Sequence, residues 1–115
     1  MSKFMYIFRG GRDPDITPAA LGVHLAHWSA WLAELTAAGR IAAVGGALLE
    51  SGRTLRGTAK AATDGPYAEA KDLVTGTITV IAESLDEATE LARGCPVFHY
   101  DGSVEVRPTA PPIAG

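Results

Sequence analysis

The chain of 115 residues contains a single cysteine, Cys95, and this excludes an internal disulfide. Such sparing use of cysteine is typical of a reducing compartment. No apolar run approaches the roughly 20 residues needed to span a bilayer. Residues 1–9 are too short and too mixed to form a signal peptide. The sequence therefore predicts a soluble, cytoplasmic protein with no membrane partner.

An excess of positive charge is also missing. The formal net charge is −3 at pH 7, and the sequence pI is about 5.5. A nucleic-acid-binding domain would normally present a basic face, so nucleic acid is not an expected partner. The length predicts one domain with a core of its own, over residues 1–108, followed by a loose tail over residues 109–115.

Motifs for cofactors are absent as well. The sequence has no phosphate loop, Rossmann glycine fingerprint, zinc-ligand spacing or nucleophile elbow, so we predict no cofactor and no resident metal. The one metal alternative is His24 with His27, which would need Asp64 or His99 as a third ligand. Cys95 lies between Gly94 and Pro96, a setting more typical of a small packed residue than of a nucleophile.

The first two predicted elements are a strand and a long helix. The strand over residues 3–9 is apolar on both faces, so we expect both to be covered. Thr17-Pro18 begins a helix that should run to Ala38 and end at Gly39. Its predicted apolar stripe consists of Leu21, Leu25, Trp28, Leu32 and Leu35. His24 is expected at the margin of this stripe, Trp31 further round the helix, and His27 further still, facing water or a partner subunit.

The second half predicts a similar alternation. We expect a strand over residues 41–49 with a bulge or bend at Gly45-Gly46, and a returning hairpin arm over residues 54–62. A strand over residues 73–83 precedes a helix that Ser84 and Glu87 cap and that ends near Arg93, with Leu85, Ala88, Leu91 and Ala92 inward. Short strand pieces should follow over residues 97–100 and 103–107.

This order indicates an α+β fold of the ferredoxin-like type, in which two βαβ units place two helices on one face of an antiparallel sheet. The other face of that sheet would be bare in a monomer. Bare apolar faces are usually buried against another surface, so we predict a homodimer.

Candidate chemistry centres on the stretch Thr63-Asp64-Gly65-Pro66-Tyr67. Asp64 is either a residue that only holds a turn or a carboxylate at the mouth of a cavity. A carboxylate can fix the tautomer of a histidine and raise its basicity, so we predict an acid-base pair of His24 and Asp64. The predicted cleft is lined by His24, Trp28, Trp31 and the turn at residues 64–66. Arg9, Arg56 and Arg107 are alternative clamps for an anion.

Five segments together resemble the YCII-related proteins, in the subgroup named for its DGPF sequence. They are FMYIFRGG (residues 4–11), HLAHW (24–28), TDGPYAEAK (63–71), SLDEATELARGCP (84–96) and SVEVRP (103–108). Tyr67 stands where the subgroup name has Phe, and Thr75-Gly76-Thr77 stands where relatives often have Gly-Gly-aromatic. The resemblance implies a ferredoxin-like fold and a dimeric α+β barrel. It also implies a functional aspartate at Asp64 and a histidine at His24, with His27 as the alternative register.

Together these observations predict an enzyme for a small anionic organic molecule, of the lactone or halogenated-acid type, with lyase, isomerase or dehalogenase-like chemistry. His24 would transfer a proton and Asp64 would orient it. Arg9, Trp28, Trp31, Pro66 and Tyr67 would contact the substrate. The rival interpretation is a non-catalytic dimer that binds a small ligand or regulates another protein.

Overall fold

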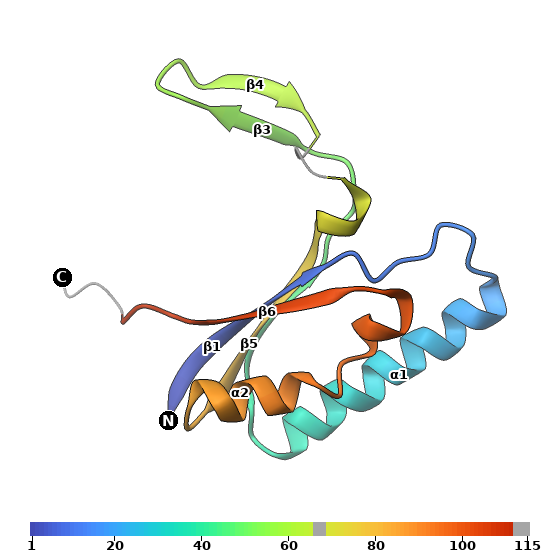
Figure 1. Cartoon of the computed structure of the whole chain (residues 1–115), viewed down its shortest axis with the longest axis vertical. Coiled ribbons are helices and arrows are strands. Elements are labelled where there is room, and N and C mark those ends of the chain that lie inside the picture. The colour runs from blue at the N-terminus through green and yellow to red at the C-terminus, as the bar shows by residue number, and fades with distance from the viewer. Residues whose placement is uncertain (66–68, 112–115) are drawn as a thin grey trace.

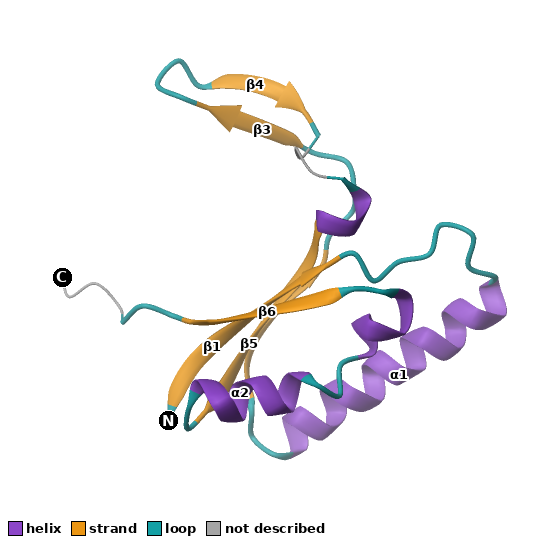
Figure 2. Cartoon of the chain, in the orientation of Figure 1, coloured by secondary structure: helices purple, strands orange, loops and turns teal. Residues whose placement is uncertain are grey.

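The computed structural model of the chain describes residues 1–65 and 69–111. Four antiparallel strands form the main sheet in the order β2-β5-β1-β6 (Figure 1). These strands are β1 (Ser2–Arg9), β2 (Ile41–Ala47), β5 (Val74–Ala82) and β6 (Ser103–Pro108). The helices α1 (Pro18–Ala37) and α2 (Leu85–Ala92) cover one face of this sheet (Figure 2). The predicted α+β fold, with two helices packed against an antiparallel sheet, is confirmed.

The central strand β1 supplies the middle of the core. Phe4, Tyr6 and Phe8 are buried on the helix face, while Met5 and Ile7 point to the opposite face and are half-buried. The Tyr6 hydroxyl donates a hydrogen bond to the Ala88 carbonyl and so ties β1 to α2. Desolvation raises the pKa of Tyr6 to about 12, as expected for a phenol that remains a buried donor.

Helix α1 begins and ends as the sequence predicts, but its buried stripe differs. The Thr17 hydroxyl accepts from the Ala20 amide at the start, and Gly39 follows the end with φ +71°. The prediction that Leu21 and Leu25 face the core is wrong, because their side chains are 40% and 54% exposed. The buried residues of this helix are His24, Trp31 and Leu35. His24 therefore lies within the inward face, on the half of α1 that packs against the segment after α2 rather than on the sheet.

Helix α2 is capped as predicted. The Ser84 hydroxyl accepts from the Glu87 amide, and the Glu87 carboxylate accepts from the Glu83 amide. Ala88 and Ala92 are buried, but the prediction that Leu85 points inward is wrong, because it is 46% exposed. Leu85 is the first residue of the helix and lies at its margin.

The predicted hairpin arm over residues 54–62 is also wrong in its pairing. The segment forms a separate two-stranded hairpin of β3 (Arg53–Arg56) and β4 (Ala61–Asp64), which pair with each other and not with the main sheet. Figure 1 shows this hairpin standing away from the body, above the one-turn helix η1 (Ala70–Asp72). The bulge predicted in β2 is confirmed by shifts of its register with β5 around Val44 and Gly46.

The segment after α2 is a 3-10 helix, η2 (Pro96–Tyr100), where the sequence predicts a short strand. Pro96 suits the first helical position, and the Cys95 sulfur caps the turn by accepting from the Val97 amide at 3.5 Å. Cys95 itself is buried and unpaired, and burial raises the pKa of its thiol to about 12. The interpretation of Cys95 as a packed residue therefore agrees with its surroundings, and the turn it caps places His99 and Tyr100 against α1.

Within residues 1–65 and 69–111, no helix has both the length and the apolar content that crossing a membrane requires.

Candidate functional site

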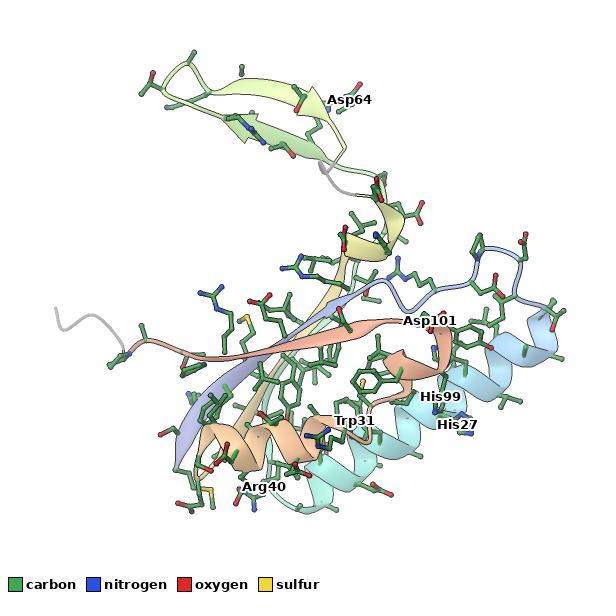
Figure 3. The ribbon with its side chains drawn as sticks, viewed as in Figure 1. His27, Trp31, Arg40, Asp64, His99 and Asp101 are labelled. Carbon is green, nitrogen blue, oxygen red and sulfur yellow. The ribbon has the colours of Figure 1, made fainter. Side chains whose placement is uncertain are left out.

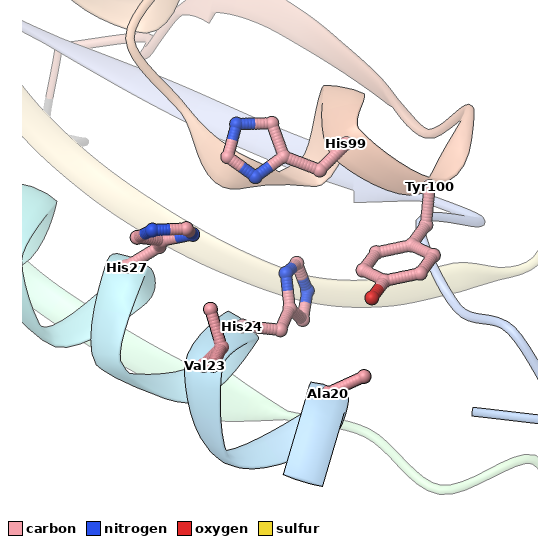
Figure 4. A pocket seen from close by; sticks show the side chains of 6 residues that line it. All are labelled: Ala20, Val23, His24, His27, His99 and Tyr100. Atoms are coloured by element: carbon pink, nitrogen blue, oxygen red, sulfur yellow. The ribbon is translucent and has the colours of Figure 1, made fainter. Parts of the chain in front are cut away.

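The histidine cavity, an open surface pocket of about 390 Å³, lies between α1 and η2. Figure 4 shows its walls, which come from Ala20, Val23, His24 and His27 on α1 and from His99 and Tyr100 on η2. One turn separates Ala20 from His24, and His27 is three residues further on, so this face of the helix points at η2. The cavity is therefore lined by three imidazoles and a phenol, and no carboxylate is among these lining residues.

His24 is the buried member of this group. Only 9% of the residue is exposed. The indole N–H of Trp28, one turn along α1, donates to His24 Nε2 at 3.1 Å. The other ring nitrogen, Nδ1, is buried and has no hydrogen-bond partner in the described part of the chain. Such an atom is uncommon in a folded protein.

The surroundings of His24 favour its neutral form. Burial lowers its pKa from the ordinary 6.5, and His99 and His27 lower it further because each becomes a like charge when protonated. The unfolded chain binds this proton with ordinary affinity, whereas the folded chain resists it. His24 thus contributes stability above its unfolded pKa, and that contribution is lost as the pH falls below about 6.5.

The three histidines lie close enough to act on one small molecule. The ring centroids of His27 and His99 are 5.3 Å apart, and those of His24 and His99 are 6.3 Å apart. The Tyr100 ring stands edge-on to His24, with centroids 4.7 Å apart. Among the described residues, no group of three or more His, Cys, Asp and Glu side chains has an arrangement that could hold a metal ion.

Asp64, the other half of the predicted pair, lies at the end of β4 in the projecting hairpin. Its side chain is 98% exposed, and its carboxylate is 3.7 Å from the Arg53 guanidinium. Figure 3 shows it far from His27 and His99, which lie with α1 and η2 on the other side of the molecule. Within one chain, the structure does not bring Asp64 to the histidine cavity.

The remaining predicted site residues lie in different surroundings. Trp28 contacts His24 directly, and its ring meets Phe8 edge-on at 5.2 Å. Trp31 is 6% exposed and stacks on Tyr6 in the core, with centroids 6.2 Å apart. Arg9 lies at the end of β1, where it contacts the Asp72 carbonyl and the Glu105 carboxylate. Pro66 and Tyr67 lie outside the described residues. Of the three that the structure describes, Trp28 is the one that contacts a residue lining the cavity.

The two lining residues on η2, His99 and Tyr100, have no predicted contact with substrate: the sequence suggests His99 only as a metal ligand and suggests no role for Tyr100. The signal that could have found both is Pro96, because proline at the first position of a turn predicts that the next residues curl rather than extend. A 3-10 turn rises only about 2 Å per residue, so it keeps residues 99 and 100 beside α1, where an extended strand would carry them along the sheet.

Comparison with protein families gives a match over residues 12–111 to the YCII-related domain. The chain belongs to the YCII-related domain family. A comparison with curated proteins finds no match. Among solved structures, the chain is similar to 5-chloro-2-hydroxyhydroquinone dehydrochlorinase from Burkholderia phenoliruptrix AC1100 in complex with 2,5-dihydroxybenzoquinone. The two chains are 23% identical; the match covers 89% of this chain and 90% of that chain, with a TM-score of 0.40.

Proposed function

We propose that this member of the YCII-related family is an enzyme that acts on a small organic anion, of the lactone or halogenated-acid class, in the histidine cavity. The observation that carries the proposal is the lining of the cavity, where three imidazoles from α1 and η2 meet with no acidic side chain among them. Imidazoles are the usual proton-transfer groups near neutral pH, and their protonated forms attract anions. We assign the chain to the DGPF-type subgroup on its TDGPY stretch.

The enzyme works as a homodimer in this proposal. The radius of gyration is 15.9 Å, whereas a compact chain of this length is expected at roughly 13 Å. An isolated two-stranded hairpin is marginally stable in water, and the β3–β4 hairpin exposes 69% of Leu55. The open sheet face also carries Met5 and Ile7. A second copy that receives this hairpin and covers this face would complete a dimeric α+β barrel with ferredoxin-like halves.

A dimer would allow the predicted His24–Asp64 pair to form between two subunits, which the geometry of one chain does not allow. The Asp64 side chain is exposed to solvent at the base of the projecting hairpin, and the pocket that His24 lines is open to solvent. We propose that the partner subunit's Asp64 approaches the histidine cavity, where its carboxylate would accept a hydrogen bond from an imidazole N–H and fix the orientation of that ring.

Mixing two inactive variants tests this arrangement. Light scattering should first give about twice the chain mass of 12.0 kDa. A substrate is then found by screening small lactones and halogenated acids. The His24→Ala and Asp64→Asn proteins should each be nearly inactive. In a mixed dimer, one of the two sites has both native residues, so co-refolding equal amounts should restore about a quarter of the native activity.

A site formed within one subunit predicts the opposite result. If His24 and Asp64 acted within one subunit, neither site of the mixed dimer would be intact and no activity would return. As a control, co-refolding His24→Ala with His24→Gln should restore nothing, since no dimer in that mixture holds a native His24. A monomer by light scattering, or activity in Asp64→Asn alone, would remove the shared-site proposal.

A non-catalytic ligand-binding role is the second candidate. The observation that favours it is the state of His24, whose Nε2 is occupied by Trp28 and whose Nδ1 is covered. A binding protein would hold the same small anions with native affinity and never turn them over. Calorimetry with each compound of the screen, beside product analysis, separates the two functions.

A further inference from the structure

We infer that Trp28 holds His24 as the neutral tautomer protonated on Nδ1, so that His24 serves the cavity as a hydrogen-bond donor and not as a group that transfers a proton. The tautomer follows from the ligand-free geometry alone. The role toward a ligand rests on the proposed function.

The hydrogen bond between Trp28 and His24 can run in only one direction. An indole N–H is a donor only, so in the contact between Trp28 Nε1 and His24 Nε2 at 3.1 Å the histidine nitrogen must accept. The length is ordinary for such a bond. A neutral imidazole has one acceptor nitrogen and one N–H, and with Nε2 accepting, the proton lies on Nδ1.

The bond from Trp28 is incompatible with the protonated form of His24. A protonated imidazole carries hydrogen on both nitrogens, so the imidazolium form of His24 would point an N–H at the indole N–H. His24 can therefore not act as a base at Nε2 while the bond to Trp28 persists. Loss of the Nδ1 proton would leave an imidazolate, which is far too basic to form near neutral pH. Both proton-transfer routes of His24 are closed in this arrangement.

The titratable groups around His24 agree with a neutral ring. They are His27 on the same helix and His99 and Tyr100 on η2. Burial is the largest cause of the lowered pKa of His24, and the two histidines add to it. Each of these effects, like the Trp28 bond, disfavours the charged form.

The Nδ1–H group of His24 remains available as a donor. Nδ1 is buried without a partner and belongs to a residue that lines the cavity. A ligand that displaces a neighbouring side chain and reaches this buried atom would supply the missing acceptor. Its chemistry would be an oxygen that gains negative charge during reaction, such as a lactone carbonyl, an enolate or a phenolate. A neutral histidine used as an electrophile in this way has a precedent in triosephosphate isomerase.

Nitrogen NMR of the ligand-free, ¹⁵N-labelled protein tests the inference without any substrate. Long-range correlations should show a protonated Nδ1 and an unprotonated Nε2 for His24 at pH 7. A scalar coupling between Trp28 Nε1 and His24 Nε2 should appear across the hydrogen bond. A protonated His24 Nε2 at pH 7, or the absence of that coupling, would overturn the inference.

A matched pair of variants tests whether Trp28 determines the tautomer of His24. Trp28→Phe keeps an aromatic ring and removes the donor, so the His24 proton should shift toward Nε2 and the pKa of His24 should rise. Trp31→Phe is the control and should leave the His24 tautomer unchanged, because no hydrogen bond joins Trp31 to His24 among those of the described residues. An unchanged His24 in folded Trp28→Phe would contradict the inference. If that variant does not fold, the coupling in the native protein decides. Because none of these readouts needs turnover, they can fail or succeed independently of the proposed enzyme.

Discussion

Replacing His24 with alanine is expected to lower turnover about 10²- to 10³-fold, the usual effect of losing one donor to a developing oxyanion. Replacing it with asparagine should cost much less, roughly tenfold on the same scale. The asparagine amide nitrogen, like Nδ1 of histidine, is bonded to Cγ, so it can present an N–H at nearly the same position. The asparagine amide does not act as an acid or a base near neutral pH. The measurement is kcat for both variants on a substrate from the screen.

Glutamine at position 24 is the matched control for this pair. Its amide nitrogen lies one bond further from the backbone and corresponds to Nε2, which faces Trp28. His24→Gln should therefore resemble His24→Ala. If His24→Asn is as slow as His24→Ala while all three variants keep their thermal midpoints, His24 transfers protons and the donor role is wrong.

Trp31→Ala is expected to reduce the free energy of unfolding by about 3–5 kcal/mol, the range for removing a large aromatic side chain from a core. Trp31 is 6% exposed and contacts the rings of Tyr6, Phe8 and Trp28. The loss is a large part of the 5–15 kcal/mol that stabilises a typical domain, so thermal unfolding should shift strongly. Urea titration at pH 7 followed by circular dichroism measures it.

Leu25→Ala on the same helix is the control for the Trp31 prediction. Leu25 is 54% exposed, so its truncation should change the free energy of unfolding by no more than about 0.5 kcal/mol. Equal losses in the two variants would mean that the stripe through Leu21 and Leu25 is buried after all. A Trp31→Ala protein with native stability and weaker ligand affinity would show that Trp31 belongs to the binding site.

Local signals in the sequence predict the boundaries of the elements well. Thr17 with Pro18, Gly39, and Ser84 with Glu87 each act through hydrogen bonds or backbone angles within one turn of the chain, so the residues themselves carry the information. The alternation of β1 likewise predicts its buried face, because side chains in a strand point to opposite sides at each residue.

Features that depend on distant partners could not be predicted in the same way. Leu21 and Leu25 continue a helical stripe, but the part of α1 that carries them packs against η2, so the stripe is not buried throughout its length. Residues 97–100, by contrast, contain apolar side chains typical of a strand, but the local signals of Pro96 and the cap at Cys95 make them a 3-10 helix, so the sequence does carry the information for this turn. Tyr100 reaches the cavity as a consequence.

The predicted pair shows the same division. His24 is expected at the margin of the helix stripe, and the structure places it within the inward face, since its helix determines its direction. Asp64 was expected beside it, but its hairpin pairs with itself and extends from the body. Sequence spacing carries no information about which chain's cavity such a hairpin would approach.

The most direct test of a small-anion site between α1 and η2 is a titration that follows the imidazole carbon-bound protons of His24, His27 and His99 by NMR. A compound turned over or bound in the screen should shift all three resonances together and saturably, with the same dissociation constant. The His24→Ala protein should then show a weaker constant at the two remaining histidines. Saturable binding of that compound by calorimetry with all three histidine resonances unmoved would contradict the account and place the site elsewhere on the protein.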